Sequence, residues 1–136
     1  MARTPKPIEP IDTAVSEILT YLRTRTKVSQ DYLAAETGIS QNRISNVLRG
    51  KNPATIGEID LLAQAMRCTA SRVIAAAEWA VTGEIPMIED NTDWNIIYTL
   101  AIIVNPRLQP CNPYGLAALA TPYDIRAQIE AEQEEP

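Results

Sequence analysis

Apolar side chains recur with helical spacing in the first part of the chain. In residues 12–26 they occupy positions i, i+3, i+4 and i+7, beginning at Val15. This spacing predicts a helix with Asp12 as its N-cap, because a carboxylate can accept hydrogen bonds from the free backbone N–H groups of a first helical turn. Three prolines before residue 11 indicate that the chain reaches this helix as an extended arm.

Residues 29–50 contain two shorter apolar patterns separated by Gly38. Ser29 and Ser40 are the expected N-caps of two helices of about two turns each, and Gly50 ends the second helix. The buried side of the first helix is expected to contain Tyr32, Leu33 and Ala34. The corner between the helices is expected to be closed by Ile39, Ile44 and Val47. This segment is therefore predicted to be a helical hairpin with a tight turn.

Two further helices are predicted before residue 83. Thr55 and Glu58 form an S/T-x-x-E capping box in front of a new apolar pattern. Thr69 is the expected N-cap of the helix after it. Together with the three helices above, these make a five-helix unit over residues 11–82, and a polar, acidic stretch with glycine and proline marks a boundary behind it.

The segment 94–104 is apolar on nearly all sides. Its β-branched residues favour a strand, whereas capping residues before it and Asn105-Pro106 after it favour a helix, which is our prediction. Such a segment has to bury its surface, either against residues 11–80 or against a second copy of the chain. In the second case the self-association surface would consist of Trp94, Ile97, Leu100 and Ile103.

These patterns predict an all-α chain in four parts, which are a flexible N-terminal arm (1–10), a five-helix domain (11–82), a linker with the apolar segment (83–104) and a loosely ordered tail (105–136). The tail holds five of the ten prolines and ends in the acidic sequence IEAEQEEP. A short helix within it could begin at Thr121, with Ile125 and Ile129 on its apolar face.

The net charge of −5 belongs to the C-terminal part of the chain. Residues 1–83 carry ten basic and eight acidic residues, a net charge of +2, whereas residues 84–136 carry two and nine, a net charge of −7. Within residues 20–51 six basic residues face only two acidic ones. An acidic protein can therefore still present a local basic surface to an anionic partner.

Composition argues against several classes of protein. The 136 residues fit one domain, and no apolar run approaches the roughly 20 residues that span a bilayer or resembles a secretory signal. Histidine is absent, and Cys68 and Cys111 have neither metal-finger nor CxxC spacing, so both are expected to be reduced, as in a cytoplasmic protein. Without a phosphate-binding loop or a catalytic cluster, we predict no enzyme activity, catalytic residue, metal or cofactor.

The second helix of the predicted hairpin has an unusual polar face, made of Gln41, Asn42, Arg43, Asn46 and Arg49. Each of these side chains alone would be explained by solvation. As a set on one helix they are notable, because amide and guanidinium groups have the bidentate geometry that matches adenine and guanine edges in the major groove of DNA.

Residues 29–77 resemble the lambda-repressor-like helix-turn-helix family, which includes the Cro and cI repressors. The residues that fall at the family's spacing are Gln30, Leu33, Ala34, Gly38, Ile39, Ser40, Ile44, Val47, Gly50, Ile59, Leu62, Ala63 and Met66. They cover the family's helices two to five, and the first helix fits by pattern only. The resemblance implies a five-helix DNA-binding domain with a small C-terminal appendage, whose third helix enters the major groove.

The resemblance also implies roles for individual residues. Base contacts are implied for Ser40, Gln41, Asn42, Arg43 and Asn46, of which Arg43 could also reach a phosphate. Phosphate contacts are implied for Gln30, Arg49, Lys51 and Asn52. The loop departs from the family in carrying Pro53, which removes a backbone donor and leaves contacts there to the two residues before it.

The function implied by the resemblance is a sequence-specific transcriptional repressor that occupies an operator, similar to the immunity or lysogeny repressors of temperate phages. Self-cleavage is excluded because the last serine is Ser71 and the last lysine is Lys51, which leaves no Ser–Lys pair in the C-terminal half. The expected partners are double-stranded DNA and a second copy of the chain, at least on DNA, with no membrane and no small-molecule ligand. The alternative is an antitoxin-like protein whose C-terminal segment binds a toxin and whose DNA binding serves autoregulation.

Overall fold

The computed structural model describes residues 7–88 and 91–108, and these residues form an all-α fold, as predicted. Its helices are α1 (Pro10–Thr26), α2 (Gln30–Thr37), α3 (Gln41–Leu48), α4 (Ile56–Ala65), α5 (Ala70–Thr82) and α6 (Asn91–Val104). The segment 94–104 is thus helical, as we expected. Most of the predicted arm and the tail from residue 109 on, with Cys111 and the helix expected from Thr121, lie outside the described residues.

Side-chain caps fix the start of the central helices where the sequence predicts them. The hydroxyl oxygens of Ser29, Ser40 and Thr69 each accept a hydrogen bond from a backbone N–H in the first turn of α2, α3 and α5, at 3.0–3.3 Å. Thr55 and Glu58 form the expected reciprocal capping box at the start of α4. The backbone N–H of Glu58 donates to the Thr55 hydroxyl at 3.1 Å, and the backbone N–H of Thr55 donates to the Glu58 carboxylate at 2.9 Å. These caps satisfy backbone donors that a short helix would otherwise leave free.

The start of α1 differs from the prediction. Asp12 is not the N-cap but the third helical residue, where its carboxylate accepts a hydrogen bond from the backbone N–H of Glu9 at 2.9 Å. The helix begins earlier because Pro10 occupies its first position, where the fixed φ of proline suits a helix and its missing N–H costs no hydrogen bond.

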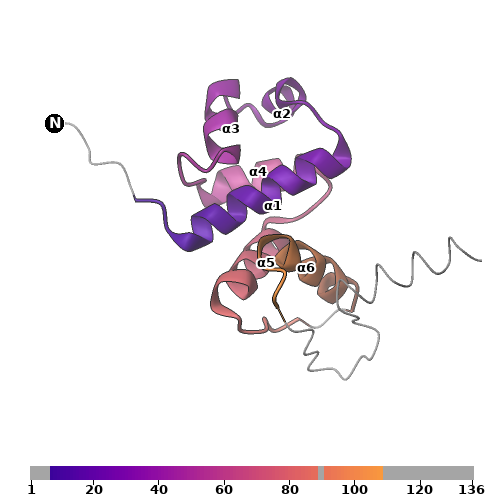
Figure 1. The fold of residues 1–136 in the computed structure, drawn as a ribbon. Helices are drawn as coiled ribbons and strands as arrows, with labels where there is room; N and C mark the ends of the chain where they lie inside the picture. The colour runs from indigo at the N-terminus through magenta and orange to yellow at the C-terminus, as the bar shows by residue number, and fades with distance from the viewer. Residues whose placement is uncertain (1–6, 89–90, 109–136) are drawn as a thin grey trace, which may run out of the picture.

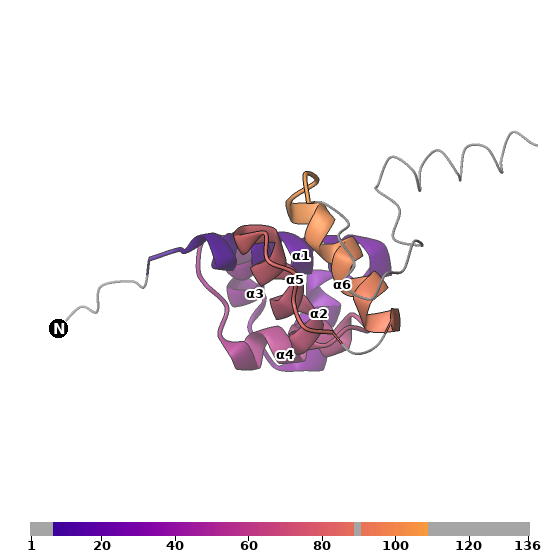
Figure 2. The ribbon, with the colours of Figure 1, turned by 90° about the horizontal axis from the view of Figure 1, so that it is seen from below.

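The helices pack in two groups on either side of α1, which crosses the middle of the molecule (Figure 1). The hairpin of α2 and α3 lies on one side, and α5 and α6 lie on the other; α6 packs against both α5 and α1 (Figure 2). One continuous hydrophobic core joins both groups, from Ala14 in α1 to Leu108 after α6. None of the helices in the described part of the chain is long and apolar enough to cross a membrane.

Helix α6 belongs to this core, which corrects the expected self-association surface. Trp94, Ile97 and Leu100 are buried within the chain, with at most 5% of each exposed. The Trp94 ring lies 4.9 Å from that of Trp79 in α5, measured between centroids. Burial of these large apolar side chains stabilises the single chain, so no partner is needed to cover them. Of the four residues proposed for self-association only Ile103, with 41% exposure, is accessible.

The predicted boundary after residue 82 is therefore a turn within one folded unit. Polar contacts tie the two sides of this turn together: Arg72 of α5 forms a salt bridge with Asp93 of α6, and the Asn105 amide donates a hydrogen bond to the Ala80 carbonyl at 3.0 Å. The helical hairpin also needs one correction, since Leu33 is fully buried but Tyr32, expected on the buried side, is 45% exposed.

Candidate nucleic-acid interface

Helix α3 separates its apolar and polar residues cleanly. Ile44 and Val47 are buried in the core, whereas Gln41, Asn42 and Arg49 are exposed. Eight residues are too few for a helix that is stable alone, so packing and capping hold α3 in place. The amide-bearing face predicted from the sequence is therefore presented to solvent on a fixed support.

Helix α1 holds the C-terminal end of α3. The Ser16 hydroxyl donates a hydrogen bond to the Val47 carbonyl at 2.7 Å, and the Thr20 hydroxyl donates one to the Leu48 carbonyl at 3.0 Å. Carbonyl groups in the last turn of a helix lack helical partners, and these hydroxyls supply them. Ser16 is buried, so its contact is shielded from water. Sequence reasoning missed both contacts, which join residues about 30 positions apart.

The loop after α3 turns sharply and presents basic and amide groups. Gly50 has a φ of +74°, a conformation that favours glycine, and lets the backbone N–H groups of Lys51 and Asn52 turn back to the Asn46 carbonyl. The side chains of Arg49 and Lys51 are exposed. They follow α3 directly, in the region where the resemblance places phosphate contacts.

Arg43 is held against α4 by its Nε and Nη2, so the predicted base contact would have to come from its Nη1 group, which donates no hydrogen bond within the described residues. Its Nε and Nη2 donate hydrogen bonds to the two carboxylate oxygens of Glu58, both at 2.8 Å, and Nη2 also donates to the Pro53 carbonyl at 2.9 Å. A guanidinium group matches a carboxylate in this two-point geometry. We call this set of contacts the Arg43–Glu58 clamp; it joins α3, the loop and α4.

The clamp has an electrostatic consequence. Hydrogen bonds from Arg43 lower the pKa of Glu58 from its ordinary 4.5 to about 2, against an opposing effect of burial. The same hydrogen bonds raise the pKa of Arg43. Glu58 also accepts a hydrogen bond from the Thr55 backbone N–H at 2.9 Å, so one carboxylate both caps α4 and holds α3. The capping role was predictable from the sequence, whereas the link to Arg43 was not.

Helix α2 contributes to the same face. The Gln41 amide of α3 donates a hydrogen bond to the Asp31 carboxylate of α2. One N–H of this amide is thereby engaged, while its oxygen and its second N–H stay available. Gln30, at the first position of α2, lies beside Asp31, so the N-terminus of α2 and the start of α3 are adjacent.

The structure thus brings most of the predicted residues to one region. Gln41 and Asn42 are exposed at the start of α3, Ser40 caps it, and Asn46 is partly buried one turn further on. The predicted phosphate contacts, Gln30, Arg49, Lys51 and Asn52, lie at the start of α2 and just after α3. What this arrangement defines is a helix-turn-helix, in which α3 is the exposed second helix.

Comparison with known families agrees with the geometry. Residues 19–73 match the family model described as helix-turn-helix, from the middle of α1 into α5. The match spans 55 of the 136 residues, and these residues are similar to the helix-turn-helix family of DNA-binding transcription regulators. Searches of curated proteins and of solved structures gave no match.

Proposed function

We propose that the chain is a sequence-specific repressor, which binds double-stranded DNA through the major groove and represses transcription by occupying an operator. The observation that carries the proposal is the exposed face of α3, where Gln41 and Asn42 stand on a helix anchored by α1 and α4. A rigid helix with amide groups at its N-terminal end is the arrangement by which helix-turn-helix domains contact base edges.

Base recognition is assigned to Ser40, Gln41, Asn42 and Asn46. An amide can bind adenine with two hydrogen bonds, one donated and one accepted. Gln41 keeps its amide oxygen and one N–H for a base, and its hydrogen bond to Asp31 fixes the orientation of the amide. A fixed amide selects one base more strongly than a freely rotating, solvated side chain would. Arg43 is left out of this set because Glu58 and Pro53 take up three of its five N–H donors and hold the guanidinium group against α4.

Phosphate contacts are assigned to Gln30, Arg49, Lys51 and Asn52. Gln30 stands at the N-terminus of α2, where backbone N–H groups and the helix dipole favour an anion. The other three residues follow α3 and would contact the DNA backbone beside the C-terminal end of this helix. Phosphate contacts at both ends of α3 would fix the depth of this helix in the major groove of DNA without adding a preference for any base.

Two copies on a two-fold operator complete the proposal, since a single helix-turn-helix buries little DNA surface. The buried residues of α6 do not supply the contact between copies. The particular role we propose is that of a temperate-phage immunity repressor that acts without self-cleavage. Support comes from the resemblance and from the lack of serine after residue 71 and of lysine after residue 51.

Selection of binding sites from random-sequence duplexes tests these assignments together. The full chain should enrich one motif, and two inverted half-sites in that motif would support binding as a dimer. Asn42→Ala should weaken binding to the enriched duplex by about 5- to 150-fold, the loss of one bidentate contact, with little effect on unrelated DNA. Asn95→Ala, an exposed amide on α6, is the matched control. Equal affinity of Asn42→Ala and wild type for the enriched duplex would remove Asn42 from the interface.

A further inference from the structure

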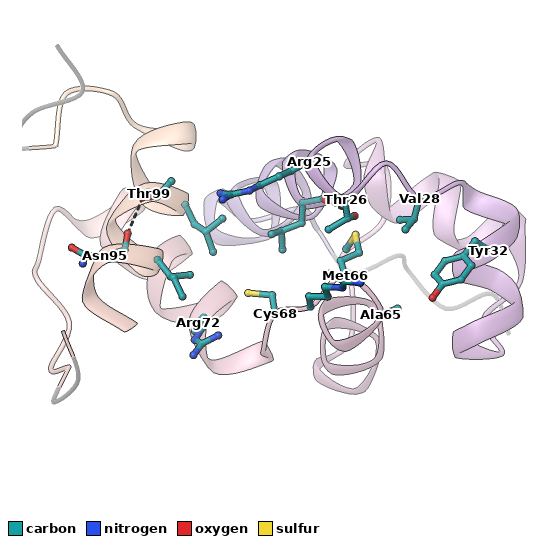
Figure 3. Close-up of a pocket in the computed structure, with 14 residues that line it drawn as sticks. Arg25, Thr26, Val28, Tyr32, Ala65, Met66, Cys68, Arg72, Asn95 and Thr99 are labelled. Carbon is teal, nitrogen blue, oxygen red and sulfur yellow. Dashed lines mark hydrogen bonds between the residues drawn. The ribbon is translucent and has the colours of Figure 1, made fainter. Parts of the chain in front are cut away.

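A groove of about 650 Å³ runs across the molecule from α2 to α6, and none of its lining residues belongs to α3 (Figure 3). Its apolar lining includes Leu22, Met66 and Leu100, which are largely buried core residues. Its charged lining consists of Arg25, Arg67 and Arg72, with no aspartate or glutamate. The groove therefore combines apolar surface with positive charge.

Two of the three arginines lack an acidic partner. Arg72 is neutralised by its salt bridge with Asp93, but Arg25 donates only a long hydrogen bond of 3.4 Å to the Tyr21 hydroxyl. Arg67 forms no side-chain hydrogen bond or ion pair within residues 7–88 and 91–108. Both unpaired side chains are exposed. A ligand that fills the groove should accordingly carry negative charge.

Arg67 also occupies a backbone position that would suit glycine. Its φ is +61°, in the left-handed region, at the turn between α4 and α5. Glycine is the usual residue at such a turn because a side chain there raises the backbone free energy. An arginine in this place, among the residues that line the groove, points to a use for its guanidinium group.

We propose that the groove binds the acidic C-terminal segment of the chain itself, residues 121–136. This segment carries five acidic residues and one basic residue, a net charge of −4. Its sequence pattern places Ile125 and Ile129 on one helical face, which suits the apolar lining, while the carboxylates suit Arg25 and Arg67. The proposal does not depend on DNA binding.

The segment can reach the groove of its own chain. Leu100 lines the groove, and Leu108, eight residues later, is buried against the core. Eight residues span at most about 28 Å, whereas the 12 residues 109–120 extend to about 40 Å. The connecting sequence is therefore long enough for residues 121–136 to fold back to where α6 lines the groove.

A spin label in the segment tests the proposal on the full chain. A nitroxide is attached through Gln133→Cys in a Cys68→Ala, Cys111→Ser background, and amide signals are recorded by NMR. Docking predicts loss of signal intensity at Thr26, Val28 and Thr99 around the groove, with Asn42 on α3 unaffected. The loss should disappear in Arg25→Glu/Arg67→Glu and decline with rising salt concentration.

Several results would overturn it. Intensity loss centred on α3, no loss at all, or loss that persists in Arg25→Glu/Arg67→Glu would each exclude the groove as the charged docking site.

A mixing experiment distinguishes docking within one chain from docking of a second copy. Isotope-labelled chains without a spin label are mixed with spin-labelled chains that carry no isotope label. Loss in the mixture equal to that in the single chain would assign the groove to a second copy and refute docking within one chain. A further measurement needs no spin label. Four glutamates of the segment are changed to glutamine, namely Glu130, Glu132, Glu134 and Glu135. These changes should shift the amide signals of the groove when Arg25 and Arg67 are present, and should not shift them in Arg25→Glu/Arg67→Glu.

Discussion

The Arg43–Glu58 clamp should contribute measurably to stability, and Glu58→Gln tests this. Glutamine keeps the size of the side chain and can still accept the hydrogen bond from the Thr55 backbone N–H. It removes the negative charge to which Arg43 is paired at 2.8 Å. The substitution therefore weakens the link between α3 and α4 while largely leaving the cap of α4 in place.

The magnitude follows from the pKa of Glu58. Its fall from 4.5 to about 2 corresponds to an upper limit of about 3 kcal/mol. The Arg43 side chain is 32% exposed and that of Glu58 is 17% exposed, so solvent screens part of the interaction. We expect Glu58→Gln to lower the free energy of unfolding by about 1–2 kcal/mol at pH 7.

The effect should depend on pH with a definite sign. A carboxyl group whose pKa is lower in the folded protein stabilises the fold above its unfolded pKa, and that stabilisation is lost as the group is protonated. For Glu58 the contribution is complete above pH 4.5 and is lost as the pH falls through about 2. The difference in stability between wild type and Glu58→Gln should therefore shrink across this acidic window.

Urea unfolding followed by circular dichroism at pH 7 and at acidic pH measures both quantities. Glu17→Gln, on the exposed surface of α1, is the matched control and should leave the urea midpoint nearly unchanged at each pH. A Glu58→Gln midpoint equal to wild type at pH 7, or a difference that does not shrink on acidification, would refute the electrostatic account of the clamp.

Three further substitutions test other parts of the structure. Ser16→Ala removes the buried donor to the Val47 carbonyl and should cost about 1–3 kcal/mol in urea unfolding; an unchanged midpoint would contradict a buried hydrogen bond. Lys51→Ala should weaken binding to all duplexes about equally and reduce the slope of log affinity against log salt by about 1, whereas a loss confined to the preferred site would indicate a base contact. Trp94→Ala should destabilise the single chain by about 3–5 kcal/mol, as expected for a large core side chain; a change in sedimentation with unchanged stability would instead restore α6 as an interface.

Local features of the fold were predictable because they depend on nearby residues. The caps at Ser29, Ser40 and Thr69 and the capping box of α4 require only a polar side chain two or three positions before a backbone donor. The buried face of α3 follows from helical spacing. The start of α1 was the exception, because Asp12 and Glu9 both suit the first turn and Pro10 decided between them.

Contacts between distant elements were not predictable in the same way. Arg43 has an exposed helical position by spacing, and nothing near it in the sequence indicates that Glu58, 15 positions later, accepts hydrogen bonds from its Nε and Nη2. The segment 94–104 posed a related problem. Its apolar pattern predicts that it is buried, but does not indicate which element covers it. Only the packing of α6 on α5 and α1 settles that Trp94 joins the core of its own chain.

These distant contacts bear directly on recognition. Helix α3 is held by Ser16 and Thr20 at its C-terminal end and by Glu58 through Arg43, and none of these three anchoring residues belongs to α3 itself. A helix of eight residues has little stability of its own, so in the proposed complex the angle of α3 in the major groove of DNA depends on these anchors. Loss of an anchor should weaken binding to every base position together, because the whole helix moves. Loss of Asn42 should affect only the base that we propose it contacts. The pattern of affinity across operator variants thus separates residues that support α3 from residues that contact DNA.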